Sequence, residues 1–174
     1  MRRLFLTLLA LVTASPALAD PLTITKTATV ISDPLGYTVT PRSLPGAIVD
    51  YKILYLNPNA NWLWPVRNIV SEDMLPANVI LRVSDIAAAG KGPVEFLDGS
   101  LLGTGLGGSG LGYTFTSLAS TTDGIDFYNG TTWTYTPTPD ASGYDANVRG
   151  IRVRTTSTFA TGTQFQLRFR VKIR

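Results

Sequence analysis

Apolar and polar residues alternate along most of this chain with a period of two, which is the pattern of half-buried β-strands. The alternation is clearest near the start, over 22–30, where threonines occupy one face, and at the end, over 164–173, where basic residues do. No segment shows the 3.6-residue period of a long amphipathic helix. The pattern predicts further strands at 49–55, 66–72, 78–83, 125–128, 131–135 and 148–155.

Turn residues separate these segments. The chain holds 16 glycines and 11 prolines, and Asn129-Gly130 is the favoured pair for a two-residue type I′ hairpin between the strands at 125–128 and 131–135. Many short strands at such spacing predict an all-β fold, an antiparallel immunoglobulin-like β-sandwich in a single domain. The segment 99–112 interrupts the pattern with glycines, and we expect there a long mobile loop or a stretch that orders only against a partner.

Residues 1–19 have the three parts of a secretory signal peptide. Two arginines form a positive region, residues 4–12 form an apolar run, and an Ala-Leu-Ala cleavage site precedes Asp20. The apolar run is too short to span a bilayer. We therefore expect Sec-type export from a bacterial cell and a mature chain at 20–174 that is secreted or held at the cell surface, without insertion into the membrane.

The amino-acid composition excludes several classes of function. The sequence has no cysteine and no histidine, which excludes disulfide staples, thiol nucleophiles, zinc-finger sites and catalytic triads whose base is an imidazole. Removal of the two signal-peptide arginines leaves 13 basic and 12 acidic side chains, a net charge of +1. That balance gives no reason to expect nucleic acid or an anionic membrane as a partner. We expect a protein that is not an enzyme and that holds no cofactor or metal.

The stretch 22–83 carries a series of short motifs made of turn and core residues. They are Thr25-Lys26-Thr27 in the first strand, Pro45-Gly46 before Val49-x-Tyr51-x-Ile53, Asn57 after that strand, and Asp73-Met74-Leu75-Pro76 with Val79 beyond it. Together these motifs resemble the bacterial DUF11 surface-repeat domain. The resemblance implies an immunoglobulin-like sandwich displayed outside the cell, with no catalytic residues. The sequence departs from the family pattern in having one copy rather than an array, and in an inserted loop at 59–65.

Charge is unevenly distributed along the mature chain. From Arg149 onward there are seven basic residues and no acid, whereas 20–148 holds six basic and twelve acidic residues. Three interpretations of these basic side chains are open. They form a solvated face that keeps an edge strand from pairing with other chains, or they dock on the acidic part of a neighbouring copy. In the third interpretation they bind acidic polysaccharide or nucleic acid. The candidate docking charges are Arg152, Arg154, Arg168, Arg170, Lys172 and Arg174.

The N-terminal strand, at 20–31 after cleavage, has two alternatives. It pairs as the first strand of its own sandwich, or it is exchanged and donated to the sheet edge of another copy. A head-to-tail contact of the second kind builds a filament where it does not close into a ring. If the strand is donated, the side chains that would insert into a groove of the neighbouring copy are Leu22, Ile24, Ala28 and Val30.

The sequence thus predicts a non-enzymatic exported structural protein, a self-assembling subunit of an extracellular filament or surface layer whose partners are other copies of itself. Strand donation and charge-complementary contacts would hold the assembly together. The alternative is a carbohydrate-binding or adhesive module, in which Trp62 and Trp64 stack on the sugar rings of a surface polysaccharide.

Overall fold

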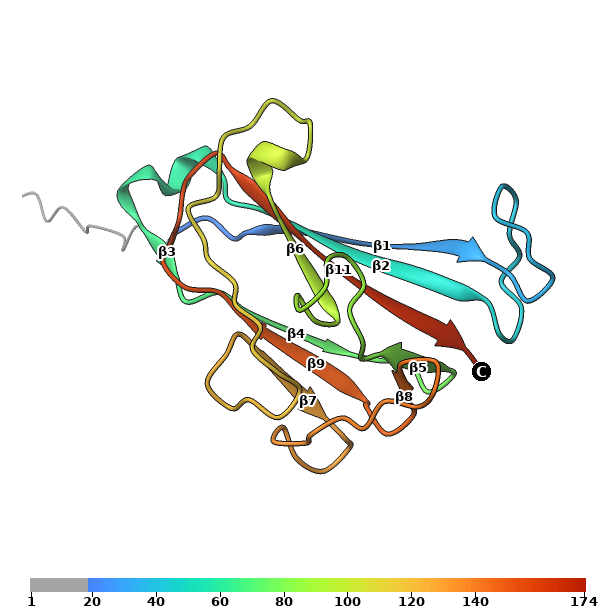
Figure 1. Ribbon diagram of the computed structural model, residues 1–174. Helices are drawn as coiled ribbons and strands as arrows, with labels where there is room; N and C mark the ends of the chain where they lie inside the picture. Colours follow the sequence, from blue (N-terminus) through green and yellow to red (C-terminus); the bar gives the residue numbers. More distant parts are fainter. Residues whose placement is uncertain (1–18) are drawn as a thin grey trace, which may run out of the picture.

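The computed structural model describes residues 19–174, so the predicted signal peptide lies outside the described residues except for Ala19. The described residues form antiparallel β-sheets packed as a sandwich, which confirms the predicted all-β class (Figure 1). No helix within them is long and apolar enough to cross a bilayer. The elements are β1 (Thr23–Ser32), β2 (Ile48–Leu56), η1 (Asn59–Leu63), β3 (Val66–Arg67), β4 (Val70–Met74), β5 (Val79–Arg82), β6 (Val94–Asp98), η2 (Gly99–Leu101), β7 (Ile125–Tyr128), β8 (Tyr144–Asp145), β9 (Gly150–Arg154), β10 (Thr158–Phe159) and β11 (Gln164–Ile173), where η marks a 3₁₀ turn.

The larger sheet has the strand order β1-β2-β11-β5-β8. β11 is central to it, because β2 pairs along one side of β11 while β6 and β5 share the other side. The smaller sheet has the order β4-β9-β7, and β3 pairs with β10 as a short ribbon. β1 and β4 are therefore edge strands, and within residues 19–174 each of them pairs on one side only.

The alternation places the apolar side chains of both sheets in one core. In β11, Phe165, Leu167, Phe169 and Val171 are at most 2% exposed, as a strand period of two predicts. The ring of Phe165 stacks on that of Tyr55 in β2, with the ring centroids 4.7 Å apart. The inward residues of β9 belong to the same cluster, so this core joins the two sheets.

The predicted hairpin at Asn129-Gly130 is wrong. A type I′ turn needs a positive φ at both central residues, and of this pair Gly130 alone has one, at 100°. The side chain of Asn129 instead accepts hydrogen bonds from the amides of Thr131 and Thr132, both at 2.9 Å. Beyond this turn the chain touches β7 again through Thr134, in an isolated parallel bridge rather than an antiparallel strand.

The glycine-rich segment 99–112 is anchored to its own chain. The carboxylate of Asp98 accepts hydrogen bonds from the amide of Ser109 at 2.8 Å and from the hydroxyl of Ser100 at 3.0 Å. Burial would raise the pKa of Asp98, but these hydrogen bonds outweigh it and hold the pKa below its usual value. Ser109 is also fully buried within the single chain. The segment is therefore ordered without a partner, contrary to the expectation that it orders only against one.

Candidate assembly surface

β1 pairs with β2 of its own chain, and its inward side is largely uncovered. The register places Ile24, Lys26, Ala28 and Val30 opposite inward-facing residues of β2, and directly opposite residues of an antiparallel pair share a face. Ile24 is nevertheless 58% exposed, and Lys26 and Ala28 are exposed too. We call the inward side of β1 at these three residues the open face.

The open face exists because the smaller sheet ends at β4. The ammonium of Lys26 lies 2.7 Å from Oδ1 of Asp73 in β4 and 4.7 Å from the centroid of the Tyr51 ring. Next to this contact, the hydroxyl of Tyr55 in β2 shares a hydrogen bond with the hydroxyl of Ser71 in β4. On this side of the sandwich, polar contacts therefore join the two sheets, and no further strand of the smaller sheet covers β1 within residues 19–174.

The outer edge of β4 has no strand partner among residues 19–174. Such an edge presents backbone N–H and C=O groups that another strand can pair with. Two apolar side chains of β4, Val70 and Met74, are 52% and 55% exposed, on the outer side of the smaller sheet, since the inward residues of β4 are Ser71 and Asp73. We call this edge together with the open face the open flank. An uncovered strand face beside an unpaired edge is the arrangement that accepts an added strand.

The four side chains predicted to insert into a neighbouring copy lie in two different environments. Leu22 and Val30 pack in part against the core of their own domain, whereas Ile24 and Ala28 lie on the open face. β1 pairs with β2 along its length, so in this single chain the first strand belongs to its own sandwich. Exchange of the strand between copies stays a prediction.

The basic residues of β11 meet acids on the neighbouring strands. Asp50 of β2 accepts hydrogen bonds from Arg168 at 2.8 Å and from Arg170 at 2.6 Å, and Arg168 also pairs with Glu95 of β6. Asp50 is only 4% exposed. Its burial would raise the pKa, but the hydrogen bonds and charges of the two arginines outweigh burial and hold the pKa of Asp50 below its usual value.

The basic residues of β9 are also paired within the chain. Arg152 lies 2.7 Å from Glu72 of β4, and its guanidinium stacks 4.1 Å from the centroid of the Trp133 ring. Arg154 forms an ion pair with Asp126 of β7. A neighbouring copy would have to break or share these pairs in order to dock on the arginines.

The remaining two candidate docking charges lie at the end of β11. The ammonium of Lys172 is 4.5 Å from the centroid of the Tyr144 ring, and Arg174 donates to the carbonyl of Ala146 at 2.9 Å. Docking of a neighbour on any of the six basic residues stays a prediction.

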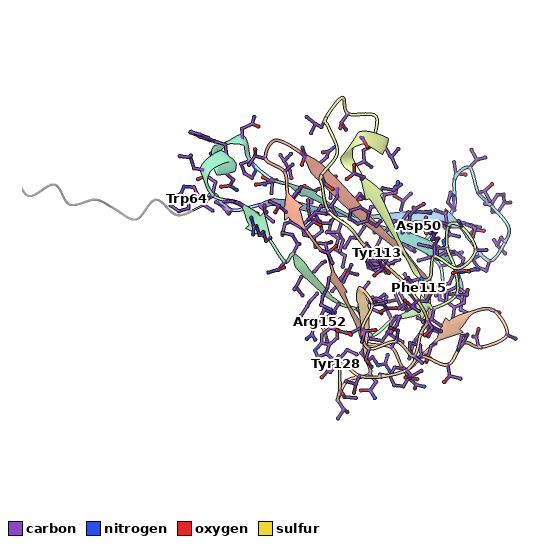
Figure 2. The ribbon with its side chains drawn as sticks, turned by 60° about the vertical axis from the view of Figure 1, so that its left-hand side comes forward. Asp50, Trp64, Tyr113, Phe115, Tyr128 and Arg152 are labelled. Carbon is purple, nitrogen blue, oxygen red and sulfur yellow. The ribbon has the colours of Figure 1, made fainter. Side chains whose placement is uncertain are left out.

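The inserted loop places its two tryptophans on the surface, and Figure 2 shows Trp64 at one end of the molecule. Trp62 is 72% and Trp64 46% exposed. Between them and the core, buried Asn61 donates to Asn57 at 2.8 Å and exchanges two hydrogen bonds with the backbone of Asp20. The turn is therefore fixed from the inside while both indoles face outward, as a stacking site for sugar rings requires.

Two parts of this surface were not predicted from the sequence. Lys26 and Asp73 both belong to the short motifs above, but their linear spacing does not pair them. The unpaired edge of β4 follows from strand order, which the alternation of residues does not encode.

Residues 19–174 contain no group of three or more His, Cys, Asp or Glu side chains placed to hold a metal ion. Comparison of the chain with protein-family models, with curated proteins and with solved structures found no match.

Proposed function

We propose that this protein is an exported structural subunit that self-associates through the open flank into an extracellular filament or surface layer. One observation carries the proposal. Ile24 points toward the smaller sheet yet is 58% exposed, and β4 beside it lacks a second strand partner within residues 19–174. A strand from another copy would cover Ile24 and would pair with the backbone groups at the free edge of β4.

Two features of the sequence support this function. The signal-peptide pattern in residues 1–19 favours export, and the DUF11-like motifs imply display outside the cell. The open flank is used once per copy, and the strand that fills it comes from a different part of the next copy. Such a contact is heterologous, so it propagates into a polymer unless the rotation between copies closes a ring.

Salt distinguishes strand addition from charge docking. Because the arginines of β9 and β11 already pair within their own chain, we expect the assembled fraction to change less than about twofold as the Debye length falls from about 10 Å at 0.1 M salt to about 3 Å at 1 M. Sedimentation velocity measures that fraction, and electron microscopy shows whether the assemblies are regular. Strong weakening by salt would assign assembly to the charges, and a protein that stays monomeric at every concentration would exclude the proposal.

A second candidate function is carbohydrate adhesion, which the exposure of Trp62 and Trp64 favours. Replacement of both tryptophans by alanine is then expected to abolish retention on a glycan array, because the stacking faces are lost. Leu101→Ala is the matched control, since Leu101 is also 72% exposed but lies in η2. Equal retention of the double variant and the wild type would rule out adhesion through this loop.

A further inference from the structure

β1 ends the larger sheet with a long free edge. It spans ten residues, Thr23–Ser32, and β2 is its one strand partner within residues 19–174. About half of the backbone N–H and C=O groups of such an edge point away from the sheet, where another strand can pair with them. Residues 23–29 are all exposed, so this edge is open to solvent in the single chain.

β1 lacks the features that usually keep an edge strand from pairing with other chains, which are a short length, bulges, prolines and charged side chains. Residues 23–30 contain no proline, and their register with β2 is regular as far as Val30. Lys26 is their one charged residue. An inward lysine can itself guard an edge, but the ammonium of Lys26 lies 2.7 Å from Asp73 of its own domain, which neutralises its charge.

The outer side of β1 is uncharged as well. It consists of threonines at every second position, which are Thr23, Thr25, Thr27 and Thr29. Threonine is favoured in strands because its side chain is β-branched. Threonines that lie directly opposite each other on paired strands also stabilise the pairing. The outer side of β1 therefore suits a copy of itself.

We propose that two copies pair antiparallel through their β1 edges, about a two-fold axis at Thr27, and so join their larger sheets into one. Facing residues then sum to 54, so that Ile24 lies opposite Val30 of the second copy and Lys26 lies opposite Ala28. On the outer side, Thr25 lies opposite Thr29. Inward residues thus face inward residues, threonines face threonines, and no like charges face each other.

The position of the axis follows from the sequence of β1. An axis through a residue keeps both smaller sheets on the same face of the joined sheet. Within the regular stretch 23–30, axes at Lys26 and at Thr27 allow the longest pairing, over 23–29 or over 24–30. An axis at Lys26 would place two ammonium groups directly opposite each other, which is destabilising. The axis at Thr27 avoids that repulsion.

The antiparallel direction also brings exposed apolar side chains at the two ends of β1 close together. The connection after β1 lies at one end of the molecule and η1 at the other (Figure 1), and η1 is tied to the start of β1 by the hydrogen bonds between Asn61 and Asp20. In the pair, the connection of each copy lies next to η1 of the other. The exposed apolar residues at these ends are Leu35, Tyr37 and Val39, and Trp62, Leu63 and Trp64. Contact between them would remove apolar area from water without refolding either turn.

This contact is separate from the one at the open flank. It uses the free edge of β1 and leaves the edge of β4 unpaired, so the two contacts involve different strands. A two-fold contact closes on itself and gives a dimer, whereas a head-to-tail contact propagates. Together they would link dimers into a filament or layer.

The absence of cysteine from the sequence allows the register to be tested by disulfide formation. Thr27→Cys is expected to form disulfide-linked homodimers, because residue 27 faces itself across the axis and facing residues of paired strands come within disulfide distance. Thr25→Cys and Thr29→Cys are each expected to form none alone and to cross-link when mixed. Leu101→Cys, at a position 72% exposed in η2, is the control for random collisions.

The second test places charges on the axis. Thr27→Glu is expected to raise the dissociation constant of the dimer by about fivefold, because two carboxylates then face each other. An equimolar mixture of Thr27→Glu and Thr27→Lys is expected to recover the association, since opposite charges then meet. Thr131→Glu, at an exposed turn position, is the control and is expected to behave as the wild type. Sedimentation velocity measures the association, and circular dichroism checks that the variants keep the fold.

The outcomes distinguish this inference from the proposed function. A wild-type protein that assembles, with Thr27→Cys cross-linking no better than Leu101→Cys, would overturn pairing at β1 and leave assembly through the open flank standing. Cross-linking of Thr25→Cys with Thr27→Cys, in place of Thr27→Cys homodimers, would overturn the axis at Thr27. Thr27→Cys homodimers from a protein that forms dimers and nothing larger would support the inference and contradict the filament. A protein that stays monomeric at every concentration would overturn both.

Discussion

Replacement of Asp50 by asparagine is expected to lower the free energy of unfolding by about 3 kcal/mol, since removal of one partner from a buried ion pair leaves the other charge uncompensated. Asp50 is 4% exposed and contacts both Arg168 and Arg170. The asparagine keeps the shape of the side chain but not its charge. Urea denaturation followed by circular dichroism measures the loss.

The matched control is Glu72→Gln. Glu72 pairs with Arg152, but its side chain is 49% exposed, and exposed ion pairs contribute only about 0.2 to 1 kcal/mol. The control is therefore expected to be nearly as stable as the wild type. Equal effects of the two changes would show that the network around Asp50 does not stabilise the larger sheet.

The same network predicts how stability depends on pH. The pKa of Asp50 is lower in the folded chain than its usual 3.8, so its contribution is present above that value and is lost as the pH falls through the folded-state pKa. The difference between the wild type and Asp50→Asn is thus expected to be constant near neutral pH and to narrow below about pH 4. A gap that does not change with pH would assign the effect to packing rather than to charge.

The alternation of residues predicted the strands that are long and half-buried. β11 and β9 follow it closely: Phe169 and Val153 are buried, while Arg170 and Arg154 between the buried positions are half-exposed. β6, β8 and β10 were missed. Two of them are two-residue strands, too short for a periodic signal, and β6 is stabilised mainly by pairing with β11, which is a tertiary contact.

The candidate site could be predicted only in part. The basic face of β11 was recognisable from the sequence, but its neutralisation by Asp50 and Glu95 depends on which strands become neighbours, and linear spacing does not contain that information. Prolines at 34 and 41 and a glycine at 36 mark the connection between β1 and β2 as a turn, but the exposure of Leu35, Tyr37 and Val39 there is seen only in the structure.

Replacement of Asn57 by alanine is expected to lower the free energy of unfolding by about 2 to 3 kcal/mol, because buried polar groups would lose their partners. Asn57 is fully buried. Its amide donates to the carbonyl of Phe159 at 2.8 Å, and its oxygen accepts a hydrogen bond from Asn61. Asn59→Ala, at an exposed position of the same turn, is the control and is expected to change stability by less than about 0.5 kcal/mol.

The Asn57→Ala variant also distinguishes the two ways in which copies could share a strand. Asn61, which bonds to Asn57, holds the backbone of Asp20 at the start of the first strand, so the variant is expected to loosen β1 and speed hydrogen exchange there. If β1 is the exchanged element, its release raises the yield of strand-swapped dimers. If β1 stays in its own sandwich and another segment fills the open flank, the Asn57→Ala protein assembles as the wild type does under conditions where both are folded.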